Sequence, residues 1–239
     1  MYQSVKVPES DRHHRRGSHV TLPCGYGFGG GRTMPGSYAN APHNARAIRH
    51  ALEDPAIQSI ATFVDHGLRH FFPKLHALAV NLDKNIVDVD NPQIERAFAD
   101  CCYPACHFNL NNACTLIHND YWNLFFFMCA VASVGPFDHT RGGHIICWSL
   151  HLVFEFPSGS TMYLPSACVP HSNTPIAPHE RRSSLAFFVP AGLARWYHNG
   201  FRSDKDFREQ ASPQQLGSWL EHRTKLWEIG AELLKHDLC

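Results

Sequence analysis

Hydrophobic residues recur with two different spacings along the chain, and the change of spacing separates a helical part from a β-rich part. Asp54-Pro55 supplies an N-cap followed by a proline at the first helical position. The apolar residues behind it recur at helical spacing and are Ile57, Ile60, Val64, Leu68 and Phe71. A shorter helix is expected to start at Asn91-Pro92 and to run through Ile94 and Phe98.

The stretch from about residue 105 to about residue 200 has the pattern of a β-rich core. Its apolar runs are short, rich in β-branched or aromatic residues, and separated by glycine, proline or asparagine. The expected strands cover residues 113–118, 124–134, 144–156, 161–169 and 183–191. Helices followed by many short strands predict an α+β fold with an antiparallel barrel or sandwich such as a jelly roll.

The two ends of the chain are expected to differ. Ser212-Pro213-Gln214-Gln215 combines an N-cap, a first-turn proline and a capping-box glutamine, so a helix is predicted over about residues 212–236. Its apolar stripe, which is expected to pack against the sheet, consists of Leu216, Trp219, Leu220, Trp227 and Leu234. Residues 1–20 are polar, with a basic run at 12–16, and predict a flexible arm or a disordered terminus without a partner. Residues 21–239 form a single predicted domain.

The glycine-rich segment at residues 25–36, GYGFGGGRTMPG, has two interpretations. A phosphate-binding loop would need the GxxxxGK[ST] pattern between a strand and a helix, and that pattern is missing. A close-packed turn is therefore expected.

Composition narrows the class of protein. Hydrophobic residues make up 44% and charged residues 18%, which is typical of a globular domain. Lysine plus arginine equals aspartate plus glutamate at 21 each, so any binding to a polyanion must come from a local patch. Nine cysteines without a C-x-x-C pair argue against a thiolate zinc site and predict a reduced, intracellular protein, which is compatible with the nucleus. The first residues lack the apolar region of a secretory signal, and no apolar run reaches the length of a membrane span.

A candidate metal site begins at His118-Asn119-Asp120, directly after an apolar run. In an extended chain residues i and i+2 point to the same side, so His118 and Asp120 can face one ion. His171 follows 53 residues later, after the run at 161–169. Two histidines and one carboxylate form the facial triad of non-heme Fe(II) oxygenases, which leaves positions open for a bidentate cosubstrate and O₂.

A candidate anion site follows the third ligand. Arg182 and Ser184 lie two residues apart on an expected strand and therefore share one face. An arginine fork makes two charge-assisted hydrogen bonds to a carboxylate such as the distal one of 2-oxoglutarate, and a serine hydroxyl adds a third. Arg181 is the alternative anchor, but it projects to the opposite side of the strand from Ser184.

Taken together, these motifs resemble the Fe(II)/2-oxoglutarate dioxygenases, and more closely the TET/JBP-related oxygenases of mushroom-forming fungi. The resemblance covers most of residues 25–201. Its motifs are FGGG at Phe28, PG at Pro35, HxDxxN at His118, GxFD at Gly135, GG at Gly142, FPxGS at Phe156, PSA at Pro165, HSNTPI at His171, ExRxS at Glu180 and GLxRWxxNGF at Gly192. The chain departs from many such relatives at His179, at Ser183 and at Ala186-Phe187-Phe188, and these changes affect the expected pocket wall.

The resemblance implies a double-stranded β-helix core of the jelly-roll or cupin kind, flanked by N-terminal helices and a C-terminal helix. It implies Fe(II) on His118, Asp120 and His171, with 2-oxoglutarate on Arg182 and Ser184 and O₂ as the oxidant. Asn123 of the HxDxxN motif is expected either to orient a ligand at the cofactor site or to cap a loop. Trp122, Trp148 and Trp196 are expected to be either stacking platforms or core residues.

The implied substrate is a methylated base in DNA, chiefly 5-methylcytosine, flipped out of the duplex. The basic residues that would contact DNA are those at 12–16 together with Arg32, Arg46, Arg49 and Arg195. Two other hypotheses stay open. The neutral charge and small size favour the same chemistry on a small molecule or a protein side chain. The other is an inactive β-helix binding module, against which the complete metal and arginine positions count. Neither a membrane nor a specific protein partner is inferred.

Overall fold

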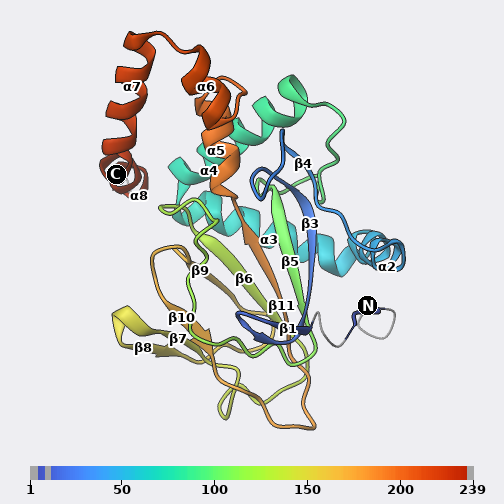
Figure 1. Cartoon of the computed structure of the whole chain (residues 1–239). Helices are drawn as coiled ribbons and strands as arrows, with labels where there is room; N and C mark the ends of the chain where they lie inside the picture. The colour runs from blue at the N-terminus through green and yellow to red at the C-terminus, as the bar shows by residue number, and fades with distance from the viewer. Residues whose placement is uncertain (1–4, 9–11, 236–239) are drawn as a thin grey trace.

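The computed structural model of the chain describes residues 5–8 and 12–235, and its centre is a six-stranded antiparallel sheet (Figure 1). The strand order is β4 (Gly36–Ser37), β3 (Val20–Gly27), β5 (Ala105–Leu110), β11 (Ser183–Phe188), β6 (Cys129–Val134) and β9 (Thr161–Leu164). A smaller antiparallel sheet has the order β10 (His171–Asn173), β7 (Ile145–Cys147) and β8 (Leu152–Phe154). The fold is thus mixed, with antiparallel sheets and flanking helices.

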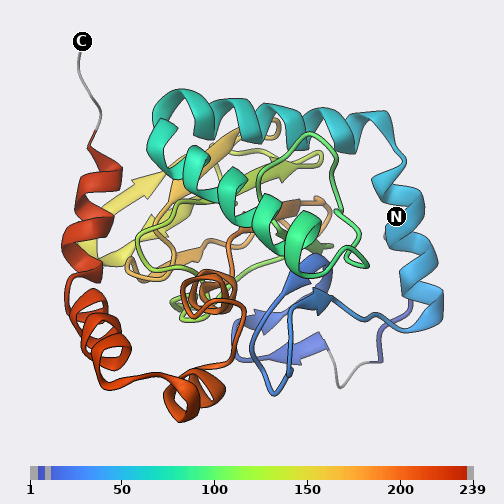
Figure 2. The same cartoon turned by 90° about the horizontal axis from the view of Figure 1, so that it is seen from above.

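Helices cover one face of the six-stranded sheet (Figure 2). These are α2 (Pro42–Leu52), α3 (Pro55–Phe71) and α4 (Pro73–Asp83), and the π-helical turn η2 (Lys84–Asp90) continues α4. The helix expected behind Asp54 is confirmed, and the Asp54 carboxylate accepts the Ala56 N–H as its N-cap. Val64 and Leu68 of α3 pack into one hydrophobic cluster with Phe108 and Phe187 of the sheet. This side of the sheet is therefore the main core, and the opposite face is left for other chemistry.

Four of the five expected strand runs contain a strand, and each of these strands is shorter than expected. The run at 113–118 is not a strand: β5 ends earlier, at the left-handed Asn111 and Asn112, and only His118 pairs, as an isolated bridge. Of the other expected strands, 124–134 forms a strand only from residue 129. The run at 144–156 is split by the short helix η3 (Trp148–Leu150), 161–169 ends before Pro165, and 183–191 ends at residue 188. Strands β3, β5 and β10 were not among the expected runs.

Two helix predictions need correction. Residues 91–104 form no helix, because the Asn91 side chain accepts the Gln93 N–H in a local turn that is not continued, although Ile94 and Phe98 are buried in the core. The C-terminal prediction gave one helix against the sheet. The structure has α7 (Pro213–Thr224), which starts with the predicted capping box, and α8 (Leu226–Leu234), after α5 (Ala191–His198) and α6 (Asp204–Gln210).

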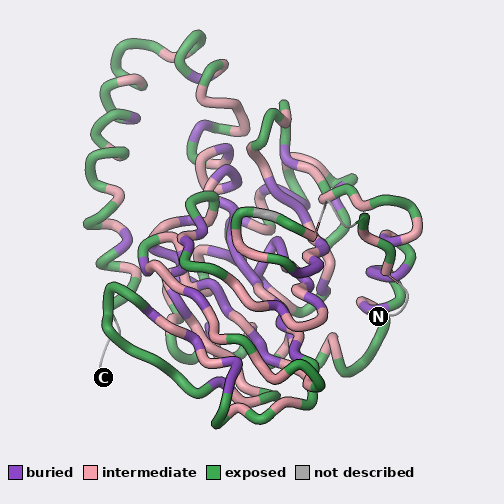
Figure 3. The backbone as a smooth tube through the Cα atoms, turned by 60° about the horizontal axis from the view of Figure 1, so that its bottom comes forward, coloured by how far each residue is buried: buried purple, intermediate pink, exposed green. Residues whose placement is uncertain are grey.

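The main contacts of α7 and α8 are with each other and with α4. Among the described residues of α7 only Trp219 is buried, and Trp227 of α8 is 70% exposed while it stacks on Phe125. In Figure 3 these helices, which lead to the end marked C, carry mostly exposed and half-buried positions. Of the predicted apolar stripe, Trp227 lies against the loop before β6, and Trp219 stacks on Phe207 of α6.

The N-terminal stretch contains regular structure. Residues 1–4 and 9–11 of the expected arm lie outside the described residues, whereas β1 (His13–His14) and β2 (Gly17–Ser18) form a hairpin just before β3. The turn of this hairpin carries Arg15 and Arg16, so part of the basic run is held in place.

The glycine-rich segment is close-packed only at its start. A side chain at Gly25 or Gly27 would collide with Pro104 or Tyr38, but both glycines lie in strand β3 rather than in the expected turn. Gly29, Gly30 and Gly31 instead have positive φ angles and open space around them. The segment therefore ends in a glycine loop beside a cavity. Among the residues described, no helix combines the length and apolar character that crossing a membrane requires.

Candidate metal centre

The backbone places His118 and His171 directly opposite each other. The two residues exchange both backbone hydrogen bonds, each with an N–O distance of 3.0 Å. Residues paired in this way point their side chains to the same side of the sheet, and the two imidazole centroids lie 4.3 Å apart. Asp120 follows two residues after His118, and its N–H donates to the Ser166 carbonyl at 2.9 Å. The donor atoms of the three side chains all lie within 4.8 Å of one another.

Hydrogen bonds fix the tautomer of both histidines. Nδ1 of His118 lies 2.8 Å from the Leu116 carbonyl, and Nδ1 of His171 lies 2.9 Å from the Val169 carbonyl. A carbonyl only accepts, so each Nδ1 carries a proton and each Nε2 is the nitrogen available to bind a metal. A carbonyl that accepts the second ring N–H is the usual support of a metal-binding histidine. Burial, and next the neighbouring His171, lower the pKa of His118 to about 4, so its ring is neutral and able to bind a cation at neutral pH.

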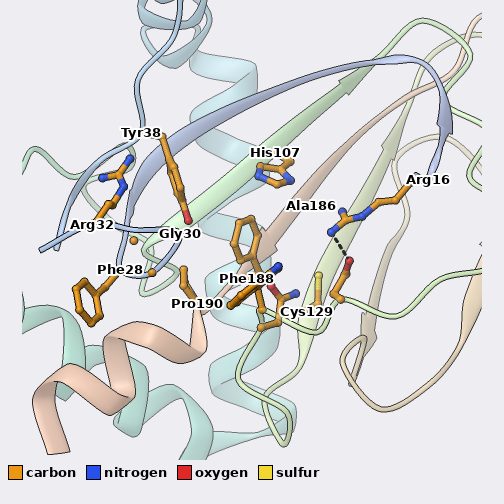
Figure 4. Close-up of a pocket in the computed structure, with 15 residues that line it drawn as sticks. Arg16, Phe28, Gly30, Arg32, Tyr38, His107, Cys129, Ala186, Phe188 and Pro190 are labelled. Carbon is orange, nitrogen blue, oxygen red and sulfur yellow. Dashed lines mark ion pairs between the residues drawn. The ribbon is translucent and has the colours of Figure 1, made fainter. Parts of the chain in front are cut away.

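Asp120 turns its carboxylate toward both free imidazole nitrogens. Its Oδ1 lies 3.7 Å from His118 Nε2, and its Oδ2 lies 4.0 Å from His171 Nε2. The same Oδ1 forms an ion pair with Arg16 Nη2 at 2.8 Å, drawn as the dashed line in Figure 4. Arg16 comes from the hairpin turn that the sequence assigned to a flexible arm, so this contact was not foreseen.

Arg182 and Ser184 lie in the same cavity as the three clustered side chains. This cavity of about 70 Å³ is lined by His118, Asp120, His171, Arg182 and Ser184, among others. Arg182 is 3% exposed; its Nη1 donates to the Ala113 carbonyl at 3.1 Å. Its guanidinium also lies over the rings of Phe137 and Phe156.

The buried charge of Arg182 has no carboxylate partner among the described residues. The Nε atom of Arg182 is also buried, and it has no hydrogen-bond partner among the described residues. Burial lowers the pKa of Arg182 to about 10. A buried cation without a counter-charge is costly, so its surroundings favour an anion. Arg181 is exposed, which agrees with the alternation expected along the strand.

Asn123 lies outside this small cavity. Its N–H donates to the Asp120 carbonyl at 2.9 Å, and its side-chain amide donates to Ser166 Oγ at 3.1 Å. Ser166 also accepts the Asp120 N–H through its carbonyl, so Asn123 and Ser166 together hold the loop that carries Asp120. The loop-capping alternative fits these contacts.

A larger cavity of about 340 Å³ adjoins the first, and Arg16, Asp120, Cys129 and Ala186 line both. Figure 4 shows its wall, where Tyr38, His107, Phe28 and Phe188 surround the space and the glycine loop borders it. The centroids of His107 and Phe188 lie 4.7 Å apart in an edge contact. Burial, and next the charge of Arg16, lower the pKa of His107 to about 4.

Sheet register explains which side chains face these cavities. Asn109 of β5 pairs with Ser184 of β11, and His107 pairs with Ala186, so these four residues share one face. His107 and Tyr38 were missed by sequence reasoning, and Arg16 was expected only as a DNA contact of the basic run at 12–16. The alternation of the ACHFNL segment was the available signal for His107, and no local signal pointed to Arg16.

Of the tryptophans and arginines expected to contact the substrate or DNA, some line the larger cavity and others do not. Trp122 is 73% exposed and lines the larger cavity, whereas Trp196 is 7% exposed and donates to Asp90, as a core tryptophan does. Trp148 donates to Ser172 Oγ at 3.0 Å and lines neither cavity. Of the basic residues, Arg32 lines the larger cavity, Arg46 and Arg49 lie on α2, and Arg195 pairs with Asp204 at 3.5 Å.

Comparison with known proteins gives a fold relationship. No family model matches the chain, and no curated protein matches it. Among solved structures, the chain is similar to NgTET1 in complex with 5mC DNA, with a TM-score of 0.55 and 15% identity over 72% of this chain and 61% of that chain. The chain thus spans less than two thirds of NgTET1. An oxidoreductase of the 2OG-Fe(II) oxygenase family from Burkholderia pseudomallei also matches, with a TM-score of 0.37 and 16% identity over 74% of this chain and 71% of that one. At these identities the likeness to NgTET1 establishes a shared fold.

Proposed function

We propose that this chain is an Fe(II)- and 2-oxoglutarate-dependent dioxygenase whose two sheets form a double-stranded β-helix. The observation that carries the proposal is the buried Arg182, without a carboxylate partner among the described residues, in one cavity with His118, Asp120 and His171. A three-residue metal cluster or a buried arginine alone also occurs in proteins of many other classes. Their combination in one cavity matches the two binding needs of this class of enzyme, a divalent metal and a dicarboxylate.

The three clustered side chains fit a divalent iron. Both histidines donate through Nδ1 to a backbone carbonyl, which leaves Nε2 as the nitrogen that faces a metal, and Asp120 supplies the single carboxylate. Two neutral imidazoles and one carboxylate leave a divalent ion with a net positive charge and with coordination positions to spare. Arg16 would act on Asp120 as a positioning residue, because it contacts the carboxylate without being a metal ligand itself.

The surroundings of Arg182 fit the distal carboxylate of 2-oxoglutarate. Its Nη1 is already engaged by Ala113, whereas its Nε has no partner among the described residues, so the guanidinium retains donor capacity. Ser184 lies on the same strand face, 5% exposed, with its Oγ accepting from the Asn109 amide at 3.3 Å. The Ser184 hydroxyl proton can therefore point toward a bound anion.

In this proposal, bound iron and 2-oxoglutarate would activate O₂ for oxidation of a substrate C–H bond. The chain's own residues would supply orientation. His118, Asp120 and His171 would hold the ion on one side of the cavity, and Arg182 would hold the cosubstrate at its far carboxylate. Phe137 and Phe156 beside Arg182 would keep water from this ion pair and so strengthen it.

We propose a methylated base in DNA as the substrate. The larger cavity meets the metal cluster at Asp120 and is walled by Phe28, Tyr38 and Phe188, with His107 on the same side. An extruded base is bound by aromatic walls and by a small number of hydrogen-bonding groups, and His107 is a group of that kind. The fold shared with NgTET1, whose structure contains 5mC DNA, supports the same substrate class.

Succinate release in the presence of Fe(II), 2-oxoglutarate and O₂ tests the proposal, with methylated DNA, unmethylated DNA and no substrate run in parallel. We expect release to rise with methylated DNA, and mass spectrometry of the digested DNA to find an oxidised base. Asp120→Ala should abolish both signals because it removes one of three metal ligands.

The matched pair Arg182→Ala and Arg181→Ala separates the cosubstrate site from a general charge effect. Loss of a charge-assisted hydrogen bond of about 1.5–3 kcal/mol should raise the KM for 2-oxoglutarate by roughly 10- to 150-fold in Arg182→Ala alone. An unchanged KM would refute the role of Arg182. If succinate is released but DNA does not stimulate its release, the proposed oxygenase activity would stand and the proposed DNA substrate would be refuted.

A further inference from the structure

A second cluster of metal-binding side chains lies among the helices, separate from the candidate centre. Asp65 comes from α3, His76 from α4, and Cys102 from the segment that leads into β5. Their donor atoms, one from each residue, lie within 4.8 Å of one another. None of the three lines the cavities around Asp120. We propose that Asp65, His76 and Cys102 form a second metal site, which takes Zn²⁺.

The helix hairpin fixes the first two members of the cluster. Helices α3 and α4 are joined through Phe72 alone and run side by side, which brings Asp65 and His76 together. Nε2 of His76 lies 3.1 Å from each carboxylate oxygen of Asp65. Asp65 Oδ1 also accepts the Cys102 N–H at 2.9 Å, which ties the third segment to the hairpin. The arrangement is thus built from three separate segments.

The site is sheltered but reachable. The side chains of Asp65 and His76 are 14% and 18% exposed, and Cys102 is 5% exposed. A cavity of about 490 Å³ adjoins all three and provides an access route for an ion and room for a water ligand. Arg96, the cation on the cavity wall, pairs with Asp83 and Asp88 at 2.7 Å each, so its charge is compensated.

The chemistry of the donors selects the metal. A thiolate, an imidazole and a carboxylate are the three ligand types that zinc uses, and three protein ligands with one water complete a tetrahedral site. A hard cation such as Mg²⁺ or Ca²⁺ prefers oxygen ligands only. Zinc binding displaces the thiol proton of Cys102 and draws the three donors from hydrogen-bond distance to coordination distance.

The alternative is a metal-free structural clamp in which Asp65 only hydrogen-bonds to His76 and accepts the Cys102 N–H. Such a clamp needs the Asp65 carboxylate and the backbone of Cys102, but not the Cys102 thiol. Cobalt distinguishes the two, because only a thiolate ligand gives a near-ultraviolet charge-transfer band with Co²⁺. The triad of His118, Asp120 and His171 contains no sulfur, so its cobalt complex would lack this band.

Metal-stripped protein titrated with Co²⁺ is the test. We expect the thiolate band in the wild type and in Asp120→Ala, and its loss in Cys102→Ser. Zinc content after loading, measured by elemental mass spectrometry, should fall by about one ion per chain in Cys102→Ser. Asp65→Asn keeps an oxygen to accept the Cys102 N–H and provides a second variant, which should weaken Co²⁺ binding by at least ~10-fold.

Cys168→Ser is the matched control, because it removes an exposed thiol outside the cluster and should keep the band. Thermal melts of the metal-free variants separate metal loss from unfolding. Absence of the band in the wild type would overturn the proposal. Persistence of the band in Cys102→Ser would also overturn it and would point to another thiol, either Cys101 on the wall of the same cavity or Cys129 beside Asp120 in the first site.

Discussion

Arg182 combines features that are rarely found together in a residue kept for stability alone. Its guanidinium is buried, lies over the rings of Phe137 and Phe156, and lacks a carboxylate partner among the described residues. Burial of an uncompensated charge costs free energy, and replacement by a well-packed apolar side chain is often neutral or stabilising. A ligand that supplies the missing anion would offset this cost, so stability and binding make opposite demands on this position.

The substitution Arg182→Met tests this opposition, because methionine fills an irregular space without a charge. We expect the melting temperature of the ligand-free variant to equal or exceed that of the wild type. In the presence of Mn²⁺ in place of iron, 2-oxoglutarate at about 100 times its Kd should stabilise the wild type by about 2.7 kcal/mol and the variant not at all. Differential scanning fluorimetry measures both effects, with Arg181→Met as the control that keeps the ligand response. A variant that is strongly destabilised, or that still responds to 2-oxoglutarate, would contradict the assignment.

Arg16 contacts a metal-ligand carboxylate from an element far away in sequence. Its ion pair with Asp120 at 2.8 Å restrains the carboxylate while leaving the imidazole nitrogens free. Because loss of such an outer contact typically weakens metal binding by about 10- to 100-fold, we expect Arg16→Ala to raise the iron concentration needed for half-maximal succinate release by that factor. Arg15→Ala, its neighbour on the same turn, is the control and should leave the iron requirement unchanged. If Arg15→Ala raised the iron requirement more than Arg16→Ala did, the turn would act through the substrate rather than through Asp120.

His107 links the larger cavity to the pH dependence of stability. Its pKa is lowered to about 4, first by burial and then by Arg16, while the unfolded value is near 6.5. Between these values the unfolded chain binds the extra proton, so stability is full above about pH 6.5 and falls as the pH drops toward 4. For a shift of this size, His107→Gln should reduce the loss of unfolding free energy between pH 7.5 and pH 5 by about 2 kcal/mol.

Urea unfolding at the two pH values measures this change. Phe188→Leu, which removes the ring contact but keeps the histidine, should destabilise the protein at both pH values and retain the wild-type pH dependence. Equal pH dependence in wild type and His107→Gln would exclude His107 as the titrating group.

At the scale of elements, the alternation of apolar and polar residues located most of the β-rich block, but the ends of strands depended on single residues. Asn111 and Asn112 adopt left-handed conformations that end β5, so the apolar residues behind them run as a loop. That loop is held by the Asn173 side chain, which accepts the Thr115 N–H at 2.8 Å. A contact between residues 58 positions apart cannot be predicted from the local pattern of apolar and polar residues.

Helix starts were easier to predict than helix partners. The N-cap at Asp54 and the capping box at Ser212 and Gln215 are local hydrogen-bond arrangements, and both form as predicted. An apolar stripe predicts that one face of a helix packs against another element, but it does not identify that element. The stripe of α7 and α8 therefore indicated packing correctly at Trp219, which donates to Asn199 from a buried position, but it could not distinguish sheet from helix as the partner.

At the scale of the whole molecule, the six-stranded sheet divides its two faces between stability and chemistry. The face toward α3 and α4 carries the apolar core, and the other carries His107, Asn109, Ser184 and Ala186. The parity of residues along one strand was enough to predict that Arg182, rather than Arg181, faces inward. Side chains from other strands or from the N-terminal hairpin enter the site through pairing and register, which local spacing does not determine.

The balance of charge over the whole chain limits its electrostatic attraction to DNA. Positive and negative residues balance at 21 each, so an attraction to DNA must come from a small number of arginines near the cavity mouth. Arg32 lines the larger cavity, and Arg15 is exposed beside it, over the ring of Tyr121 and within hydrogen-bond distance of the Asn119 carbonyl. Each arginine that neutralises a phosphate releases counterions and adds about 0.9 to the slope of log K against log salt.

We therefore expect a shallow overall salt slope for methylated duplex DNA. Arg15→Ala and Arg32→Ala should each reduce it by about 0.9, measured by fluorescence anisotropy over a range of salt concentrations. Arg49→Ala, on α2 and outside the cavity wall, is the matched control and should leave the slope unchanged. If the slope responds to Arg49 but not to Arg15 or Arg32, DNA approaches the helical face. The larger cavity would then have to bind a substrate other than a base extruded from that duplex.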